Sequence, residues 1–277
     1  MDSPRRTRPQ RRRPGAILFG ALLSIVLACD PSTVGNGEEA HGLIVFAASS
    51  LTEPFREIAA IFEKRYQHAV RLNFAGSSEL RAQMENGAHA DVFAAASEEE
   101  MKKAEQSSVV TSPPALFARN RLVIVVPTGN PGKIALPKDL ARPGLRFVTS
   151  QPAVPVGRYT LEMLDRMSRS PEYGPGFREA VLRNVVSQEM NARQVLAKVQ
   201  LGEADVAVVY ASDVAGRVAD KVQTVEVPAP FNVEAVYPVA IVGGTRREDR
   251  ARQFVDLIVS AEGQAVLGRF KFLPARP

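Results

Sequence analysis

Two short stretches of the sequence place serines between the end of a strand pattern and the start of a helix pattern. The first reads Ala-Ala-Ser-Ser at 47–50, after the strand formers Val45 and Phe46, and the second reads Ala-Gly-Ser-Ser at 75–78. A helix that begins directly after a strand leaves backbone N–H groups without intrahelical partners and has a partial positive charge at that end. With a serine hydroxyl, these groups form an anion site that needs no charged side chain. A serine in this place often acts only as a helix cap, and we expect Ser77 to cap its helix.

Two later stretches predict the same kind of helix start. Pro-Val-Gly-Arg-Tyr at 155–159 and Asn-Ala-Arg at 191–193 each precede a helical pattern, so each offers free backbone N–H groups. Tyr210 ends an apolar strand pattern and could add a phenol donor to the same cleft. Four helix starts and one tyrosine are therefore candidates for a single anion site.

The elements that must position these groups alternate between strand and helix, which predicts an α/β fold with mostly parallel sheets. We expect two lobes, with residues 43–123 as lobe 1, 124–236 as lobe 2 and 237–277 returning to lobe 1. The loop at 127–132, rich in Pro and Gly, is a plausible passage between them, and the strand pattern at 235–242 is a candidate return crossing. Ligand sites in such folds lie at the carboxyl ends of the strands. The expected elements are strands at 44–48, 69–74, 91–96, 122–126, 145–149, 185–186, 206–210, 222–227 and 235–242, and helices at 51–66, 77–85, 97–104, 157–167, 176–182, 192–201, 247–260 and 262–270.

The N-terminal segment reads as a targeting sequence. Residues 1–28 combine six arginines with a 14-residue apolar run that is short for a membrane span, which predicts a signal peptide. The run ends at Cys29, the only cysteine, so the chain can form no internal disulfide bond. Val-Leu-Ala-Cys at 26–29 resembles a bacterial lipobox, which implies lipidation of Cys29. A plain signal peptide or an uncleaved anchor are the alternatives. Residues 29–42 read as a tether.

The net charge of +5 comes from this segment. Residues 1–28 hold six of the 35 basic and one of the 30 acidic side chains, so the remaining chain carries 29 of each. A nucleic-acid-binding function is therefore not supported, because the folded part has no basic excess.

Four motifs together resemble the molybdate-binding proteins of bacterial ABC importers. They are Val-Phe-Ala-Ala-Ser-Ser-Leu-Thr at 45–52, Phe-Ala-Gly-Ser-Ser-Glu-Leu at 74–80, Val-Pro-Val-Gly-Arg-Tyr at 154–159 and Ala-Val-Val-Tyr-Ala-Ser-Asp at 207–213. The resemblance covers roughly residues 43–275 and implies a two-lobed fold like the periplasmic binding proteins of type II. It also implies that the ligand is held by Ser50 and Ser77 through hydroxyl and backbone N–H, by Val156 and Ala192 through backbone N–H, and by Tyr210 through its O–H. Val156 stands where the family often has alanine, a change that keeps the backbone donor but adds bulk.

The chemistry of the ligand agrees with this set of donors. Molybdate and tungstate are fully deprotonated at neutral pH and can only accept hydrogen bonds, so a matching pocket contains donors and no carboxylate. Phosphate keeps a proton and needs an acceptor, for which Glu79 or Asp213 could serve. Arg158 could reach the anion or remain a solvated helix residue.

The resemblance thus implies a monomeric solute-binding protein of the periplasm or cell envelope, held to the membrane through Cys29. It would bind molybdate or tungstate, without a cofactor, and deliver the ion to an ABC transporter permease. The nearest alternative is the same class of protein for sulfate or phosphate. A serine hydrolase is a more distant one, because the sequence has no Gly-x-Ser-x-Gly motif and no histidine in a convincing partner position.

Overall fold

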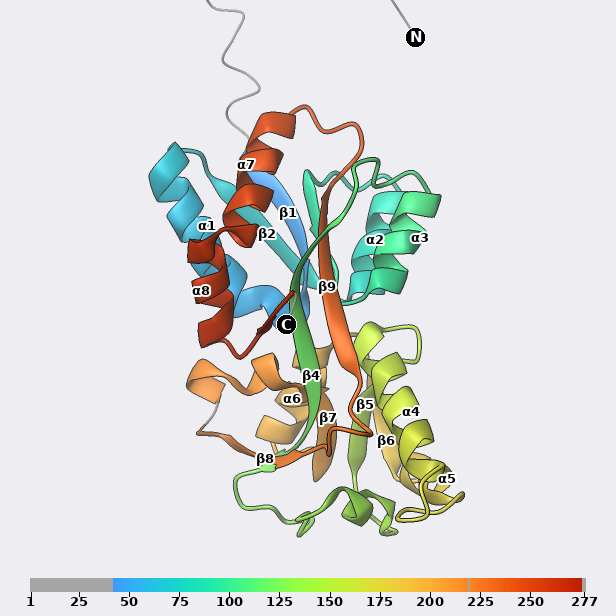
Figure 1. Ribbon diagram of the computed structural model, residues 1–277. Helices are drawn as coiled ribbons and strands as arrows, with labels where there is room; N and C mark the ends of the chain where they lie inside the picture. Colours follow the sequence, from blue (N-terminus) through green and yellow to red (C-terminus); the bar gives the residue numbers. More distant parts are fainter. Residues whose placement is uncertain (1–41, 219, 276–277) are drawn as a thin grey trace, which may run out of the picture. The chain divides into compact units, whose positions relative to one another are not determined.

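The structure, a computed structural model, describes residues 42–218 and 220–275 (Figure 1). The predicted signal peptide, Cys29 and all of the tether except Gly42 lie outside the described residues. Within the described part of the chain, no helix has the length and apolar character needed to cross a membrane.

The described part of the chain begins with three strand-then-helix units. Strand β1 (Leu43–Ala48) lies between β2 (Val70–Ala75) and β3 (Val92–Ala94) and is parallel to both. Each strand leads into a helix: β1 into the 3-10 turn η2 (Ser49–Leu51) and α1 (Thr52–Tyr66), β2 into α2 (Ser77–Glu85), and β3 into α3 (Glu98–Gln106). The carboxyl ends of β1 and β2, and so the two serine stretches, lie side by side because Ala48 pairs with Ala75.

Strand β4 (Ala115–Pro127) connects the two parts of the sheet. Up to Arg121 it pairs with β9 (Glu234–Ile241), and from Leu122 onward it pairs with β7 (Val206–Tyr210) and β8 (Val222–Glu226). The change of partner thus occurs inside the strand, before the loop at 127–132 that the sequence suggested as the passage.

The second part of the sheet has the same construction. Strand β5 (Phe147–Ser150) is parallel to β6 (Val185–Glu189) and to β7. The connections carry α4 (Pro155–Ser168), α5 (Phe177–Leu182) and α6 (Ala192–Gln200), while short 3-10 turns occupy η3 (Pro137–Ala141), η4 (Ala211–Val214) and η5 (Gly216–Val218).

The chain then returns to the first part of the sheet. Strand β9 inserts between β3 and β4, antiparallel to both, and is followed by α7 (Glu248–Val259), α8 (Ala261–Arg269) and β10 (Leu273–Pro274). The first lobe is defined here as β1, β2, β3, β9, β10 and residues 115–121 of β4 with α1, α2, α3, α7 and α8. The second lobe is β5, β6, β7, β8 and residues 122–127 of β4 with α4, α5 and α6.

Helices cover both faces of the first lobe's sheet, with α1, α7 and α8 on one side and α2 and α3 on the other (Figure 1). Alternation along β1 reflects this, because Val45 packs in the cluster with α1 and Phe46 packs in the cluster with α2 and α3. Phe55 of α1 contacts Phe254 of α7 at a ring distance of 6.1 Å, so the return segment completes the core of the first lobe. Burial of each such side chain contributes about 1.5–3 kcal/mol.

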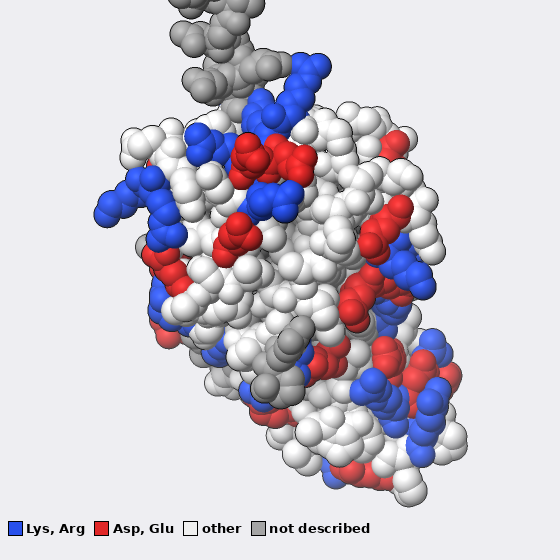
Figure 2. Space-filling model, turned by 45° about the horizontal axis from the view of Figure 1, so that its top comes forward, with Lys and Arg blue, Asp and Glu red and all other residues white. Residues whose placement is uncertain are grey.

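Charged side chains of both signs are interspersed on the face of the described residues seen in Figure 2. This distribution agrees with the equal numbers of acidic and basic side chains beyond residue 28. The expected α/β fold with two lobes and two crossings is confirmed, whereas the predicted bounds of the lobes stay a prediction.

Candidate functional site

One small cavity is lined by all five residues that the sequence selects. It lies between the ends of β1, β2 and β7 and the starts of α4 and α6, and the space there that no atom fills, open solvent at its mouth included, is about 210 Å³. Every one of the five is buried. The lining comprises Ala48, Ser49, Ser50, Ala75, Gly76, Ser77, Ala96, Val154, Pro155, Val156, Asn191, Ala192 and Tyr210.

The first lobe contributes two serines in the first turns of helical segments. Ser50 is the middle residue of η2, and Ser77 is the first residue of α2. The expectation that Ser77 caps α2 is wrong: the cap residue is Gly76, and no side chain caps this helix or η2. The hydroxyls of Ser50 and Ser77 therefore do not cap η2 and α2. The first backbone N–H groups of these two segments remain able to donate to another acceptor.

Neighbouring polar groups leave the protons of both serine hydroxyls available. The Ser77 Oγ accepts a hydrogen bond from the backbone N–H of Ala96 at 3.0 Å. The Ser50 Oγ lies 2.9 Å from the Tyr237 hydroxyl, toward which the Asn120 amide donates at 3.4 Å. When the Tyr237 hydroxyl accepts a hydrogen bond from Asn120 and donates one to Ser50, the Ser50 oxygen acts as the acceptor in that contact. Both serines can then donate their own proton into the cavity.

The second lobe contributes two helix starts. Val156 is the second residue of α4, whose cap residue Val154 makes no side-chain cap bond. Ala192 is the first residue of α6, where the Asn191 side chain accepts from the N–H of Gln194 at 3.0 Å and so occupies only that donor. Both Val156 and Ala192 thus present backbone N–H groups at the positive end of a helix.

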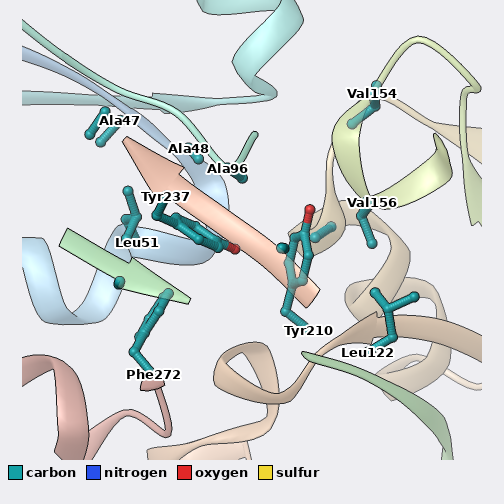
Figure 3. Close-up of a cluster of buried hydrophobic side chains, with 14 of the residues drawn as sticks. Ala47, Ala48, Leu51, Ala96, Leu122, Val154, Val156, Tyr210, Tyr237 and Phe272 are labelled. Carbon is teal, nitrogen blue, oxygen red and sulfur yellow. The ribbon is translucent and has the colours of Figure 1, made fainter. Parts of the chain in front are cut away.

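Tyr210 has a buried hydroxyl without a hydrogen-bond partner among the described residues. The side chain is 2% exposed and packs edge-on against Tyr237 at a ring distance of 5.9 Å. Figure 3 shows its oxygen directed to the space between Ala96 and Val156. Burial raises the pKa of Tyr210 well above its ordinary value, so the phenol stays protonated and acts as a donor. A buried donor without an acceptor costs about 1–3 kcal/mol, which a bound acceptor would recover.

Asp213 fixes the backbone at Tyr210 but does not line the cavity. Its Oδ2 accepts from the Tyr210 N–H at 3.1 Å, and its Oδ1 is buried without a partner among the described residues. Burial raises the pKa of Asp213 to about 7. Glu79 lies in a neighbouring groove beside α2 and is likewise absent from the cavity lining.

The cavity lining contains no charged side chain, although two arginines follow its helix starts closely. Arg158 forms ion pairs with Glu99 and Glu100 of α3, so it neither enters the cavity nor remains merely solvated. Arg193 pairs with Glu53 of α1 at 2.8 Å. The described residues also contain no group of three His, Cys, Asp or Glu that could hold a metal ion. The site can therefore bind an oxyanion only through neutral donors.

Some residues around the cavity escaped the sequence analysis. Tyr237 and Asn120 had no motif to mark them, because each acts through a contact with a distant part of the chain. Arg193 stands in the Asn-Ala-Arg stretch, but that stretch does not reveal its contact with Glu53. The continuously apolar strand pattern at 235–242 is typical of a buried strand, but it does not indicate that Tyr237 faces Ser50.

Comparison with known proteins gives a consistent result. Residues 43–272 match the family described as bacterial extracellular solute-binding protein. The chain is 38% identical to the molybdate-binding protein ModA of Mycobacterium tuberculosis over 263 residues, which cover 92% of this chain and 95% of that protein. Among solved structures, the sulfate-binding protein SubI of Mycobacterium tuberculosis matches with a TM-score of 0.76 at 19% identity, covering 86% of this chain and 88% of that one. The Azotobacter vinelandii periplasmic molybdate-binding protein matches with a TM-score of 0.71 at 22% identity, covering 83% and 98%.

Proposed function

The chain belongs to the bacterial extracellular solute-binding proteins of the molybdate-binding ModA type, and on that premise we propose that Ser50, Ser77, Val156, Ala192 and Tyr210 hold its oxyanion. It is a binding protein of an ABC transporter rather than an enzyme, and it acts outside the cytoplasm. The ligand is molybdate, with tungstate as an equivalent tetrahedral dianion.

The unpartnered hydroxyl of Tyr210 is the observation that carries this assignment. This hydroxyl points into a cavity that already gathers two serine hydroxyls and several helix-start N–H groups. A ligand with four oxygens that accept hydrogen bonds and have no proton to donate satisfies all of these groups at once. Desolvation of the dianion is offset by these convergent donors, in the same way as at other helix-start anion sites.

Phosphate fits this cavity less well than molybdate. At neutral pH it keeps a proton that needs an acceptor, and neither Glu79 nor Asp213 lies in the lining. Sulfate is also fully deprotonated at neutral pH, so its charge does not exclude it from this cavity. The likeness to molybdate-binding relatives along almost the whole chain favours the larger ion.

Neutral donors also suit a protein that must release its ligand. A pair of arginines inside the cavity would add the attraction between opposite charges to these hydrogen bonds and would hold the dianion more tightly. Because Arg158 and Arg193 are paired with carboxylates outside the lining, the ion is held by hydrogen bonds that can be broken one lobe at a time when the protein delivers it to the permease.

The N-terminal segment determines where in the cell the protein acts. Residues 1–28 direct export, lipidation of Cys29 fixes the protein to the membrane surface, and residues 29–42 act as the tether of a monomer. The lipobox-like sequence at 26–29 supports this anchor.

Calorimetric titration with molybdate, tungstate, sulfate and phosphate tests the proposed ligand. We expect tight binding of molybdate and tungstate and weak or undetectable binding of the other two. Equal affinity for sulfate would move the assignment to a sulfate-binding protein, and turnover of a chromogenic ester that is lost in Ser77→Ala would favour a hydrolase instead.

A further inference from the structure

Two arginines occupy helix positions where a positive charge is unfavourable. Arg158 is the fourth residue of α4 and Arg193 is the second residue of α6, and neither helix has an acidic residue in its first turn. A cation near the start of a helix opposes the helix dipole. Both side chains extend across to the first lobe, and these contacts offset that cost.

Arg158 contacts the segment that supports Ser77. Its Nη2 donates to the Ser97 Oγ at 2.8 Å, and its Nε lies 3.1 Å from the Glu99 carboxylate. The residue before Ser97 is Ala96, whose N–H donates to the Ser77 hydroxyl. One guanidinium therefore connects the start of α4 to the group that orients a cavity serine.

Arg193 contacts the segment that contains Ser50. Its Nε donates to the carbonyl oxygen of Ser49 at 3.3 Å, and its Nη2 donates to Glu53 at 2.8 Å. Arg193 directly follows Ala192, so the start of α6 is connected to the turn in which Ser50 lies. The two arginines make the same kind of connection on different sides of the cavity.

We propose that Arg158 and Arg193 are positioning residues that hold the helix starts of the second lobe against the two serines of the first lobe and so keep the cavity closed around the ion. This inference rests on the proposed function. Each arginine is neutralised by a carboxylate of the first lobe, so the pair stabilises the closed arrangement without adding charge to the cavity.

The expected effect of each arginine is modest, because both ion pairs are partly exposed. The side chains of Arg158 and Glu99 are 27% and 49% exposed, and those of Arg193 and Glu53 are 34% and 43% exposed. Partly exposed pairs of this kind correspond to about a two- to fivefold change in an equilibrium constant. If the protein binds only in the closed state, the loss appears as weaker apparent affinity and faster release.

The test compares R158Q, R193Q and the double variant with R146Q in the full-length chain. Arg146 pairs with Asp205 at 2.7 Å inside the second lobe, so R146Q removes an ion pair without touching the contact between lobes. We expect about two- to fivefold weaker molybdate binding in each single variant, a larger loss in the double variant, and wild-type binding in R146Q. Most of the loss should lie in the release rate of radiolabelled molybdate, and R158K and R193K should restore part of it because they keep the charge.

Two further measurements separate this inference from the proposed function. In a double-mutant cycle, E53Q and R193Q should be non-additive, which isolates the contact across the lobes. Small-angle scattering of the ligand-free protein should give a larger radius of gyration for the double variant than for wild type and R146Q. Wild type that binds no molybdate would refute the proposed function alone. Release rates and radii of gyration equal to those of R146Q would overturn the role of the arginines.

Discussion

Replacing Gly76 with alanine adds one methyl group at a place where the two lobes are in direct contact. Gly76 precedes Ser77 at the start of α2, and a Cβ atom built on it would lie 2.5 Å from the carbonyl oxygen of Met190 in the second lobe. Real Cβ atoms essentially never approach closer than 3.0 Å, so the carbonyl must retreat by about 0.5 Å or more. Because Met190 leads directly into α6, this movement would shift Ala192 away from the cavity.

The magnitude follows from the cost of overpacking a fitted contact. Such a clash typically costs about 1–3 kcal/mol, which corresponds to about a five- to 150-fold loss of molybdate affinity. The ligand-free protein should not be destabilised, because Gly76 has φ −65° and ψ 141°, a conformation that alanine adopts freely. Isothermal titration measures the affinity, and thermal unfolding without ligand measures the stability.

Gly176→Ala is the matched control for this substitution. Gly176 also occupies a helix cap position, at the start of α5, but nothing lies within 4 Å of the position that the added methyl group would take. We expect Gly176→Ala to bind as wild type does. Wild-type affinity in Gly76→Ala would refute the claim that close approach of the lobes completes the site.

Other substitutions test the individual groups. Ser77→Ala and Tyr210→Phe should each weaken molybdate binding by about 1–3 kcal/mol in titrations, because a charged acceptor loses a donor; unchanged affinity would remove that residue from the site. Tyr237→Phe removes the partner of the Ser50 hydroxyl and should weaken molybdate binding by about 0.5–1.5 kcal/mol. If Tyr237→Phe caused an equal loss in a variant that already lacks the Ser50 hydroxyl, its effect would not pass through Ser50. The pKa of Asp213 is about 7 in the folded protein, against an ordinary value of 3.8. Between pH 3.8 and pH 7 the folded protein therefore keeps a proton on Asp213 that the unfolded chain releases. The free energy of unfolding falls as pH rises through this window. Asp213→Asn should flatten the decline in melting temperature between pH 5 and pH 8, whereas an unaltered decline would assign the pH dependence to other groups.

The order of the elements could be predicted because each strand and helix has a strong local pattern. The start of α6 at Ala192 and the end of β7 at Tyr210 coincide with the predicted positions. Strand β4 was only half predicted, as residues 122–126. Its earlier half includes the polar residues Arg119, Asn120 and Arg121, and it is a strand because it pairs with β9, more than 100 residues later in the chain.

Residues of the candidate site could be predicted where the protein group that binds the ligand lies at a helix start. They could not be predicted where the site depends on contacts between distant segments. Ser50 and Ser77 stand in local motifs, and the cavity contains both. Sequence alone could not show that Gly76 rather than Ser77 ends up as the helix cap, because either residue suits that position. Nor could it show that Tyr237 supports Ser50, since the two are 187 residues apart.

The most direct test of the donor-only cavity is a crystal structure of the protein grown with tungstate, with the tungsten atom located by its anomalous scattering. The proposal predicts one strong peak inside the cavity, with ligand oxygens within hydrogen-bond distance of the Ser50, Ser77 and Tyr210 hydroxyls and of the Val156 and Ala192 N–H groups. A peak outside this cavity, or oxygens bound by Arg158 or Arg193 instead, would contradict it.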